Sequence, residues 1–182
     1  MKNPLLIFAG AAITAVLVIY IINPFGTATL DPRARIWGIT FYHIPSASMM
    51  PTLTPGDYIL VKTFAYANTT PEVGDMVVYK PPHLDTPFVG RVMARGGEKI
   101  SVQDATAIVN GQRQQEDYIL KPHGKCYIVD FPEAQVPESM LFVMGDNRCN
   151  SVDSRSFGFV NQSSLIGKVF YIWSTEEKDK ET

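Results

Sequence analysis

The feature that most constrains this fold is an uninterrupted apolar run near the N-terminus. Leu5 to Ile22 reads LLIFAGAAITAVLVIYII, eighteen residues with no charge and with Thr14 as the one polar side chain. A helix needs about 20 apolar residues to cross the hydrocarbon core of a bilayer. A cleaved signal peptide has a shorter apolar core and a small-x-small cleavage site, and the following segment NPFGTATL offers no convincing site. The run therefore predicts an uncleaved membrane anchor within residues 1–25.

Charge says little about the orientation of this anchor, but it argues against one class of partner. Lys2 and the α-amino group precede the run, and Arg33 and Arg35 follow it, so positive-inside counting is nearly balanced. The chain of 182 residues has a net charge of -2 at pH 7. It lacks the basic excess of a nucleic-acid-binding protein. We therefore expect the lipid bilayer as a partner and no nucleic acid.

After the anchor, the residue pattern is typical of β-strands. Stretches rich in aromatic and β-branched side chains alternate with proline and glycine, and Asn110-Gly111 favours a tight hairpin turn. No window from Asp31 onward keeps a helical period over three turns. The sequence therefore predicts an all-β domain over residues 26–175 and a charged, disordered tail over 176–182. The expected strands lie within RIWGITFYHI, DYILVKTF, DMVVYK, PFVGRVMA, KISV, YIVDF, LFVMG and LIGKVFYIW.

One loop carries two serines between prolines. It reads IPSASMMPTL from Ile44, with Pro45 and Pro51 restricting the backbone on either side of Ser48. A catalytic serine needs an exposed hydroxyl, a base within reach and donors for the oxyanion, and Ser46 could supply such a donor. Taken alone, this pattern is more often an ordinary loop.

A second polar segment, GDNRCNSVDSRSFGFV, runs from Gly145 to Val160 after an apolar strand. Asp153 and Arg155 are two residues apart, so an extended backbone would place both on one side. Such a pair could brace a nearby site. The alternative is a loop with a solvent-exposed salt bridge, which contributes little to stability.

Together, these segments resemble the bacterial type I signal peptidases, the membrane-bound serine endopeptidases that remove signal peptides. PSASMMPTL resembles the nucleophile box of that family, and GDNRCNSVDSRSFGFV resembles its last conserved box. GDYILVKTFAY and GDMVVYK resemble the segments between them. The resemblance implies a signal-peptidase-type β domain with one N-terminal transmembrane helix in the bacterial inner membrane. It implies a cytoplasmic N-terminus, an extracytoplasmic catalytic domain, and precursor proteins with signal peptides as partners. It implies neither a cofactor nor a metal.

The resemblance also implies a role for each residue of the site. Ser48 matches the nucleophile, and Ser46 matches a hydroxyl donor to the oxyanion. Ser151 and Asp153 resemble groups that orient the catalytic lysine, and Arg155 would hold Asp153. The pockets for small substrate side chains would be lined by Tyr42, Ile44, Leu53, Phe88 and Val89, for which a place in the ordinary core is the alternative.

One position departs from the family pattern. GRVMARGGEKI aligns without a gap with the lysine box, and Gly90 stands at the position of the catalytic lysine. Arg91 cannot replace that base, because a guanidinium stays protonated. His43 and His83 remain open as surrogate bases, each with an ordinary solvated side chain as the alternative. The nearby lysines fall in other boxes, with no reason to reach Ser48: Lys62, Lys80 and Lys99.

The two cysteines leave one structural question open. Cys149 stands where the family commonly has an aspartate, and Cys126 is the other cysteine of the chain. In an oxidising compartment, a Cys126-Cys149 disulfide and two separate thiols are both compatible with the sequence.

Two functions follow from these patterns. The first is a membrane-anchored serine endopeptidase that removes signal peptides, with its general base unidentified. The second is a catalytically inactive relative that binds an extended peptide, as an added strand, or a membrane partner. The intact boxes around Ser48 and Ser151 favour the enzyme, and Gly90 favours the binding protein. We expect the enzyme.

Overall fold

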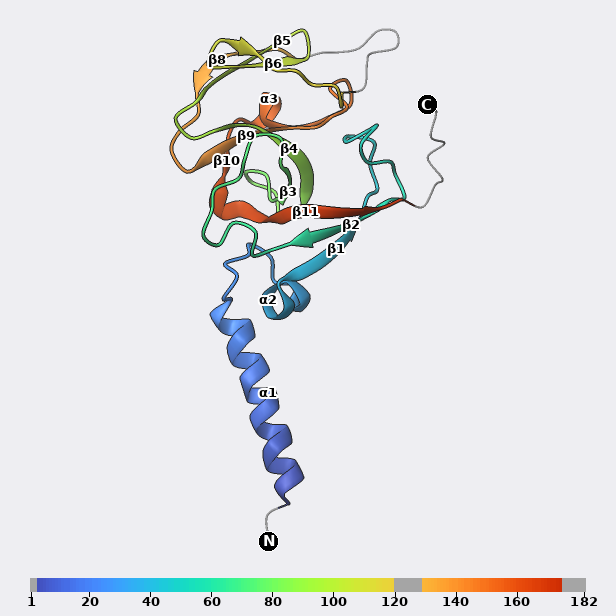
Figure 1. Cartoon of the computed structure of the whole chain (residues 1–182), viewed down its shortest axis with the longest axis vertical. Helices are drawn as coiled ribbons and strands as arrows, with labels where there is room; N and C mark the ends of the chain where they lie inside the picture. The colour runs from blue at the N-terminus through green and yellow to red at the C-terminus, as the bar shows by residue number, and fades with distance from the viewer. Residues whose placement is uncertain (1–2, 120–128, 175–182) are drawn as a thin grey trace.

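In the computed structural model, which describes residues 3–119 and 129–174, one long helix stands apart from a β domain (Figure 1). Helix α1, Pro4–Ile22, has no buried residue. It begins at Asn3, whose side chain accepts from the Leu5 N–H, and ends at Asn23 in the left-handed conformation. Within the described ranges, α1 is the one helix long and apolar enough to cross a membrane. The expected tail over 176–182 lies outside the described residues.

A short helix replaces the start of the first expected strand. Residues of RIW belong to α2, Pro32–Trp37, and the strand β1 begins only at Ile39. The prediction of strand for this stretch is therefore wrong. Pro32 occupies the first turn, Asp31 caps it by accepting from the Arg33 N–H, and Gly38 ends it in the left-handed conformation. These local stop and start signals outweigh the β propensity of Ile36 and Trp37.

The rest of the described chain confirms an all-β domain built from two antiparallel sheets. The larger sheet has the order β1-β2-β11-β3-β4-β9-β10 and the smaller one β7-β6-β5-β8. The larger sheet comprises β1 Ile39–His43, β2 Tyr58–Lys62, β11 Leu165–Trp173, β3 Met76–Tyr79, β4 Phe88–Arg95, β9 Met140–Met144 and β10 Val160–Asn161. The smaller sheet comprises β5 Lys99–Gln103, β6 Thr106–Val109, β7 Gln112–Arg113 and β8 Phe131–Gln135. The expected hairpin turn joins β6 to β7, with Asn110 and Gly111 both at positive φ.

The two sheets lie at different distances from the anchor. The smaller sheet is at the end of the domain farthest from α1, and β1, β2 and β11 are near the end from which α1 leaves (Figure 1). Two short helices complete the order, α3 at Ser154–Phe157 and the 3-10 helix η1 at Gln162–Ser164.

Strand β3 divides its side chains between two buried clusters, and this decides what surrounds Gly90 on the neighbouring strand β4. Val78 packs with Ile44 and Leu53, whereas Val77 and Tyr79 pack with a second set. The second cluster consists of Val77, Tyr79, Val92, Leu141, Val143, Val160 and Leu165, with Tyr66, Phe88 and Phe157 at its edge. Because Gly90 pairs with Val77, it faces this second cluster.

Candidate active site

A cavity of about 390 Å³ brings together most of the residues singled out in the sequence. Ser46, Ser48 and Ser151 line it, although they come from segments about 100 residues apart. The remaining wall includes four predicted substrate-contacting residues: Tyr42, Ile44, Phe88 and Val89. Leu53 is not part of the lining. It is fully buried with Met49 and Ile59, so its side chain serves packing.

The serine loop is held by the second polar segment. The hydroxyl oxygens of Ser46 and Ser48 are 3.2 Å apart and share a hydrogen bond. Asn147 donates from its backbone N–H to the Ser48 carbonyl at 3.0 Å and from its side chain to the Ala47 carbonyl at 3.0 Å. These bonds fix the loop independently of its own prolines.

Gly145 is the point at which the two segments meet. A Cβ on this residue would lie 2.2 Å from the Ser151 hydroxyl oxygen and 2.6 Å from the Ser48 carbonyl oxygen. No side chain fits there, so glycine is required for the approach of Ser151 to the serine loop. Sequence reasoning missed this role. The available signal was a glycine that directly follows a buried strand.

Asp153 and Arg155 form a buried ion pair next to Gly145. Arg155 donates two hydrogen bonds to the Asp153 carboxylate, each at 2.8 Å, and both side chains are 2% exposed. Asp153 also accepts from the Gly145 N–H at 3.0 Å, and Arg155 donates to the Arg148 carbonyl at 2.9 Å. The alternative of a solvent-exposed salt bridge is therefore wrong. The pair connects α3 to the backbone next to Ser48.

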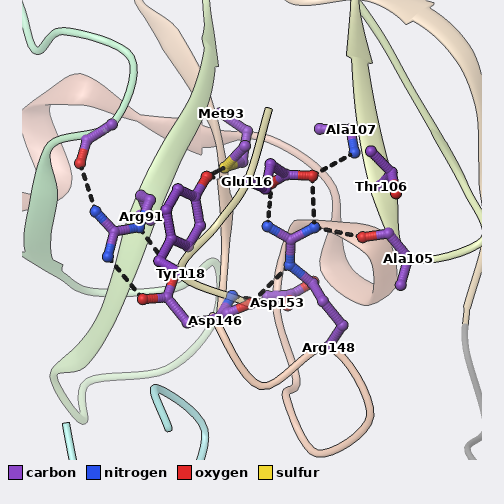
Figure 2. A network of polar contacts seen from close by, with 12 residues as sticks. Arg91, Met93, Ala105, Thr106, Ala107, Glu116, Tyr118, Asp146, Arg148 and Asp153 are labelled. Atoms are coloured by element: carbon purple, nitrogen blue, oxygen red, sulfur yellow. Dashed lines mark hydrogen bonds and ion pairs between the residues drawn. The ribbon is translucent and has the colours of Figure 1, made fainter. Parts of the chain in front are cut away.

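Arg91 forms a second, largely buried ion pair with Asp146, the residue that follows Gly145 (Figure 2). It contacts Asp146 through two hydrogen bonds of 2.9 and 2.6 Å, and the same carboxylate accepts from the Thr52 hydroxyl at 2.5 Å. Burial disfavours the charge of Arg91, but the bonds and the charge of Asp146 outweigh burial and raise its pKa. Its guanidinium therefore stays protonated and cannot serve as a base.

A third contact joins the site to the segment that follows β7 of the smaller sheet (Figure 2). Arg148 and Glu116 form an ion pair whose side chains are 1% and 2% exposed. Glu116 also accepts from the Tyr118 hydroxyl at 3.1 Å, and the Arg91 guanidinium lies 4.0 Å from the centre of the Tyr118 ring. Glu116 and Tyr118 were not predicted, because nothing near them in the sequence marks their partners 32 and 27 residues away.

Neighbouring groups crowd Gly90, the position of the missing base. Gly90 is buried in β4, and a Cβ there would lie 2.7 Å from a Val143 methyl carbon. The same Cβ would lie 3.2 Å from the Met144 carbonyl oxygen and 3.4 Å from the Cε1 carbon of Tyr79. Val143 thus takes up room that a side chain at position 90 would need, and the Tyr79 ring would be in contact with it.

The surrogate bases considered from the sequence differ in their position. His43 lies at the edge of the cavity, but its exposed ring packs at a tilt against Tyr58, with 5.1 Å between centroids. Strand alternation turns it away from the face that carries Tyr42. His83 is exposed in a loop and does not line the cavity. Of the lysines in the described ranges, none lines the cavity. Lys62 lies over the Phe64 ring, Lys80 pairs with Asp85, and Lys99 pairs with Glu133.

Cys149 is disulfide-bonded. This rules out the alternative of two separate thiols. Cys126, the other cysteine in the sequence, lies outside the described residues. Among residues 3–119 and 129–174, no group of three or more histidine, cysteine or acidic side chains could hold a metal ion.

Comparison with known proteins gives one consistent result. Residues 6–174 match the family profile described as signal peptidase, peptidase S26. The chain is 39% identical over 137 residues to a probable signal peptidase I-1 of Synechocystis, an alignment that covers 71% of this chain and 68% of that protein. It is 31% identical to signal peptidase IB of Staphylococcus aureus, covering 97% and 94%. A crystal structure of a signal peptidase I from Enterococcus faecalis matches with a TM-score of 0.50 and 32% identity, over 56% of this chain and 98% of that one.

Proposed function

The chain belongs to the signal peptidase family, peptidase S26, and from this premise we propose that it removes signal peptides from precursor proteins with Ser48 as its nucleophile. The observation that carries the proposal is the meeting of Ser46, Ser48 and Ser151 in one cavity. Two segments about 100 residues apart are hydrogen-bonded there. Such an arrangement of hydroxyl groups is expected of a serine endopeptidase site, and a purely structural loop would not require it.

In the proposed reaction, the Ser48 hydroxyl attacks the carbonyl carbon of the peptide bond at the end of the signal peptide. The developing oxyanion is held by the Ser48 backbone N–H and by the Ser46 hydroxyl, which is already within 3.2 Å of the nucleophile. Asp153 and Arg155 hold the backbone of Gly145, and through it the spacing between Ser48 and Ser151. Asp153, Arg155 and Gly145 therefore act by positioning the reacting groups.

The shape and chemistry of the cavity suit an extended peptide with small side chains before the cut. Its walls are mainly apolar, with Tyr42, Ile44, Phe88 and Val89 as the proposed substrate contacts. A peptide bound as an added strand would place alternate side chains into these walls.

We place α1 across the bacterial inner membrane, with the N-terminus in the cytoplasm and residues 26–175 on the extracytoplasmic side. An exposed aromatic surface near the anchor supports this arrangement. Trp37 and Phe41 are 74% and 51% exposed, and Tyr171 and Trp173 of β11 are 56% and 65% exposed. Aromatic side chains with a polar edge are favoured at the membrane–water interface. This surface would rest against the lipid headgroups and hold the cavity close to membrane-bound precursors.

Gly90 favours a second candidate, a relative that binds signal peptides without cutting them. The family base would come from this position, and Gly90 has no side chain. The Ser48 hydroxyl and its partners would then be retained for binding.

The experiment that separates these candidates uses the full-length protein in detergent and a precursor with alanine at the first and third positions before the cut. We expect the wild type to release the signal peptide and Ser48→Ala to bind the precursor without cleaving it. Ser163→Ala is a matched control, because Ser163 is exposed on η1 and its hydroxyl binds Asn161 outside the cavity. Equal cleavage by the wild type and Ser48→Ala would exclude Ser48 as the nucleophile. Binding without cleavage by both proteins would establish the second candidate.

A further inference from the structure

Tyr79 is a buried tyrosine beside the empty base position. In the β3–β4 pairing, Tyr79 is opposite Phe88 and Val77 is opposite Gly90. Tyr79 and Gly90 are therefore diagonal neighbours on one face of the sheet. The 3.4 Å between the Tyr79 Cε1 carbon and a Cβ at position 90 agrees with this register. The aromatic ring would therefore be in ordinary van der Waals contact with a side chain at position 90.

The hydroxyl of this tyrosine is open to the cavity. Tyr79 is 1% exposed and lines the cavity together with Ser48 and Ser151. Among the described residues, the Tyr79 hydroxyl has no hydrogen-bond partner. The one side-chain polar atom in these residues that is both fully buried and without a partner is the Thr54 hydroxyl oxygen, so the Tyr79 oxygen keeps some accessible surface. The Tyr79 oxygen is therefore not sealed inside the core. An unpaired phenol hydroxyl in a buried wall is available to form a hydrogen bond with a molecule bound in the cavity.

Tyr79 is electrostatically coupled to Asp153, the residue that holds the backbone beside the serine loop. Burial and the nearby negative charge of Asp153 raise the pKa of Tyr79, so the phenol is neutral and protonated. Asp153 holds the Gly145 N–H at 3.0 Å, and Gly145 touches both the Ser48 carbonyl and the Ser151 hydroxyl. Tyr79, Ser48 and Ser151 thus line the same cavity.

We propose that Tyr79 is a further catalytic residue, whose neutral phenol relays the Ser48 proton in the absence of a base at position 90. This inference rests on the proposed function, in which Ser48 is the nucleophile. A phenol can accept one hydrogen bond while it donates another, so it can pass a proton on without becoming charged.

The relay balances over the two half-reactions. In acylation, the Ser48 oxygen bonds to the carbonyl carbon as its proton moves to the Tyr79 oxygen. The original Tyr79 proton goes to the departing amide nitrogen, and the carbon–nitrogen bond breaks. In deacylation, water adds to the ester carbon and gives one proton to the Tyr79 oxygen, and Tyr79 returns a proton to the Ser48 oxygen. Serine, tyrosine and their protons are restored, and one water is consumed.

The first test is a comparison of Tyr79→Phe with Tyr66→Phe, using the full-length protein in detergent and the same precursor. We expect Tyr79→Phe to lower kcat by roughly 10²–10⁴-fold, the usual contribution of a proton-transfer group, with KM within about twofold of wild type. Tyr66 packs against the same cluster, but its hydroxyl binds Asp75 outside the cavity. Tyr66→Phe should therefore retain kcat.

A second test changes the acidity of the phenol and leaves its size almost unaltered. A ring-fluorinated tyrosine installed at position 79 ionises at lower pH than tyrosine. Its kcat should fall toward alkaline pH, because a phenolate has no proton to give to the leaving nitrogen. The other titratable and charged groups near the cavity are identical in the two proteins: Asp153, Arg155, His43 and Tyr42. The difference between the two pH profiles therefore reports on residue 79.

The outcomes separate the relay from the function on which it rests. Three outcomes would each overturn the relay and leave Ser48 as the nucleophile. These are cleavage by Tyr79→Phe at the wild-type rate, a rise in its KM without a loss of kcat, and identical pH profiles for the tyrosine and fluorotyrosine proteins. If the wild type is as inert as Ser48→Ala, the proposed function fails, and the relay fails with it.

Discussion

The two walls of the cavity around Ser48 are built from different interactions. On the nucleophile side, Asn147, Gly145 and Asp153 hold the serine loop through hydrogen bonds and a buried ion pair. On the base side, Gly90 is surrounded by a methyl group of Val143 and the ring carbons of Tyr79, which form no hydrogen bond with it. The nucleophile side is thus specified by directional contacts, and the base side by volume.

This difference bears on how each wall should respond to change. Directional contacts fail when one partner is removed, because a buried polar group is left without its bond. An apolar wall can be repacked if total volume is conserved. Apart from loss of the proposed proton-relay hydroxyl of Tyr79, we therefore expect substitutions on the nucleophile side to have larger effects than those on the base side, and the following predictions test this order.

The largest effect is expected from Gly145→Ala on the nucleophile side. The new methyl group would meet the Ser151 hydroxyl oxygen at 2.2 Å and the Ser48 carbonyl at 2.6 Å. One of the two segments must move away, so cleavage should fall by at least roughly 10²-fold, as it does when catalytic groups are misplaced by about 1 Å. Gly10→Ala is the control, since nothing lies within 4 Å of a Cβ there. Near-normal cleavage by Gly145→Ala would mean that the close approach of Ser151 is dispensable.

The next largest effect is expected from Asp153→Asn. Arg155 would keep its charge in a site where both side chains are 2% exposed, and it would lose its counter-charge. Removing one member of a buried pair costs about 3–5 kcal/mol of the free energy of unfolding. Urea unfolding of the full-length protein in detergent measures this loss. Asp85→Asn, which affects a surface pair with Lys80, should leave the urea midpoint unchanged. Equal midpoints for both variants would contradict the structural role assigned to Asp153.

A smaller effect is expected on the base side from Gly90→Lys. Its Cβ would lie 2.7 Å from a Val143 methyl carbon, and overpacking of this kind costs about 1–3 kcal/mol. Val143→Ala should relieve the clash, so the double variant should lose less stability than the sum of the two single variants. Only the double variant gives the lysine amine apolar room in which its pKa falls far enough to act as a base. Strict additivity of the two losses would show that Val143 does not limit position 90.

The smallest effect is a pH dependence at the start of β3, the strand that carries Tyr79. Burial alone would raise the pKa of Asp75, but bonds from Lys168, the Glu72 N–H and Tyr66 outweigh it and lower the pKa. The ionised carboxylate therefore stabilises the fold at neutral pH, and this contribution is lost as pH falls through the folded pKa. Asp75→Asn should lower Tm at pH 7 and make a smaller difference near pH 3. A constant difference in Tm across this range would exclude the linkage.

The sequence was sufficient for features that depend on neighbouring residues. The apolar run of residues 5–22 predicted α1, the stretches rich in aromatic and β-branched residues between proline and glycine predicted the all-β domain, and Asn110-Gly111 predicted the turn between β6 and β7. The segments around Ser48 and Ser151 were singled out by composition and resemblance before their contact was seen. In each case the signal lies within a few residues, because helix and strand periods and turn conformations are local properties of the chain.

The tertiary structure decided which distant groups meet. Gly145 became a required glycine only when the Ser48 carbonyl and the Ser151 hydroxyl converged on it. Leu53, expected in the substrate pocket, was assigned to the core by the turn that leads into β2. Tyr79 became the neighbour of Gly90 through the β3–β4 register, in which a shift of one residue would turn it to the other face. Register and loop docking depend on the packing of the whole domain, and no local pattern in the sequence encodes them.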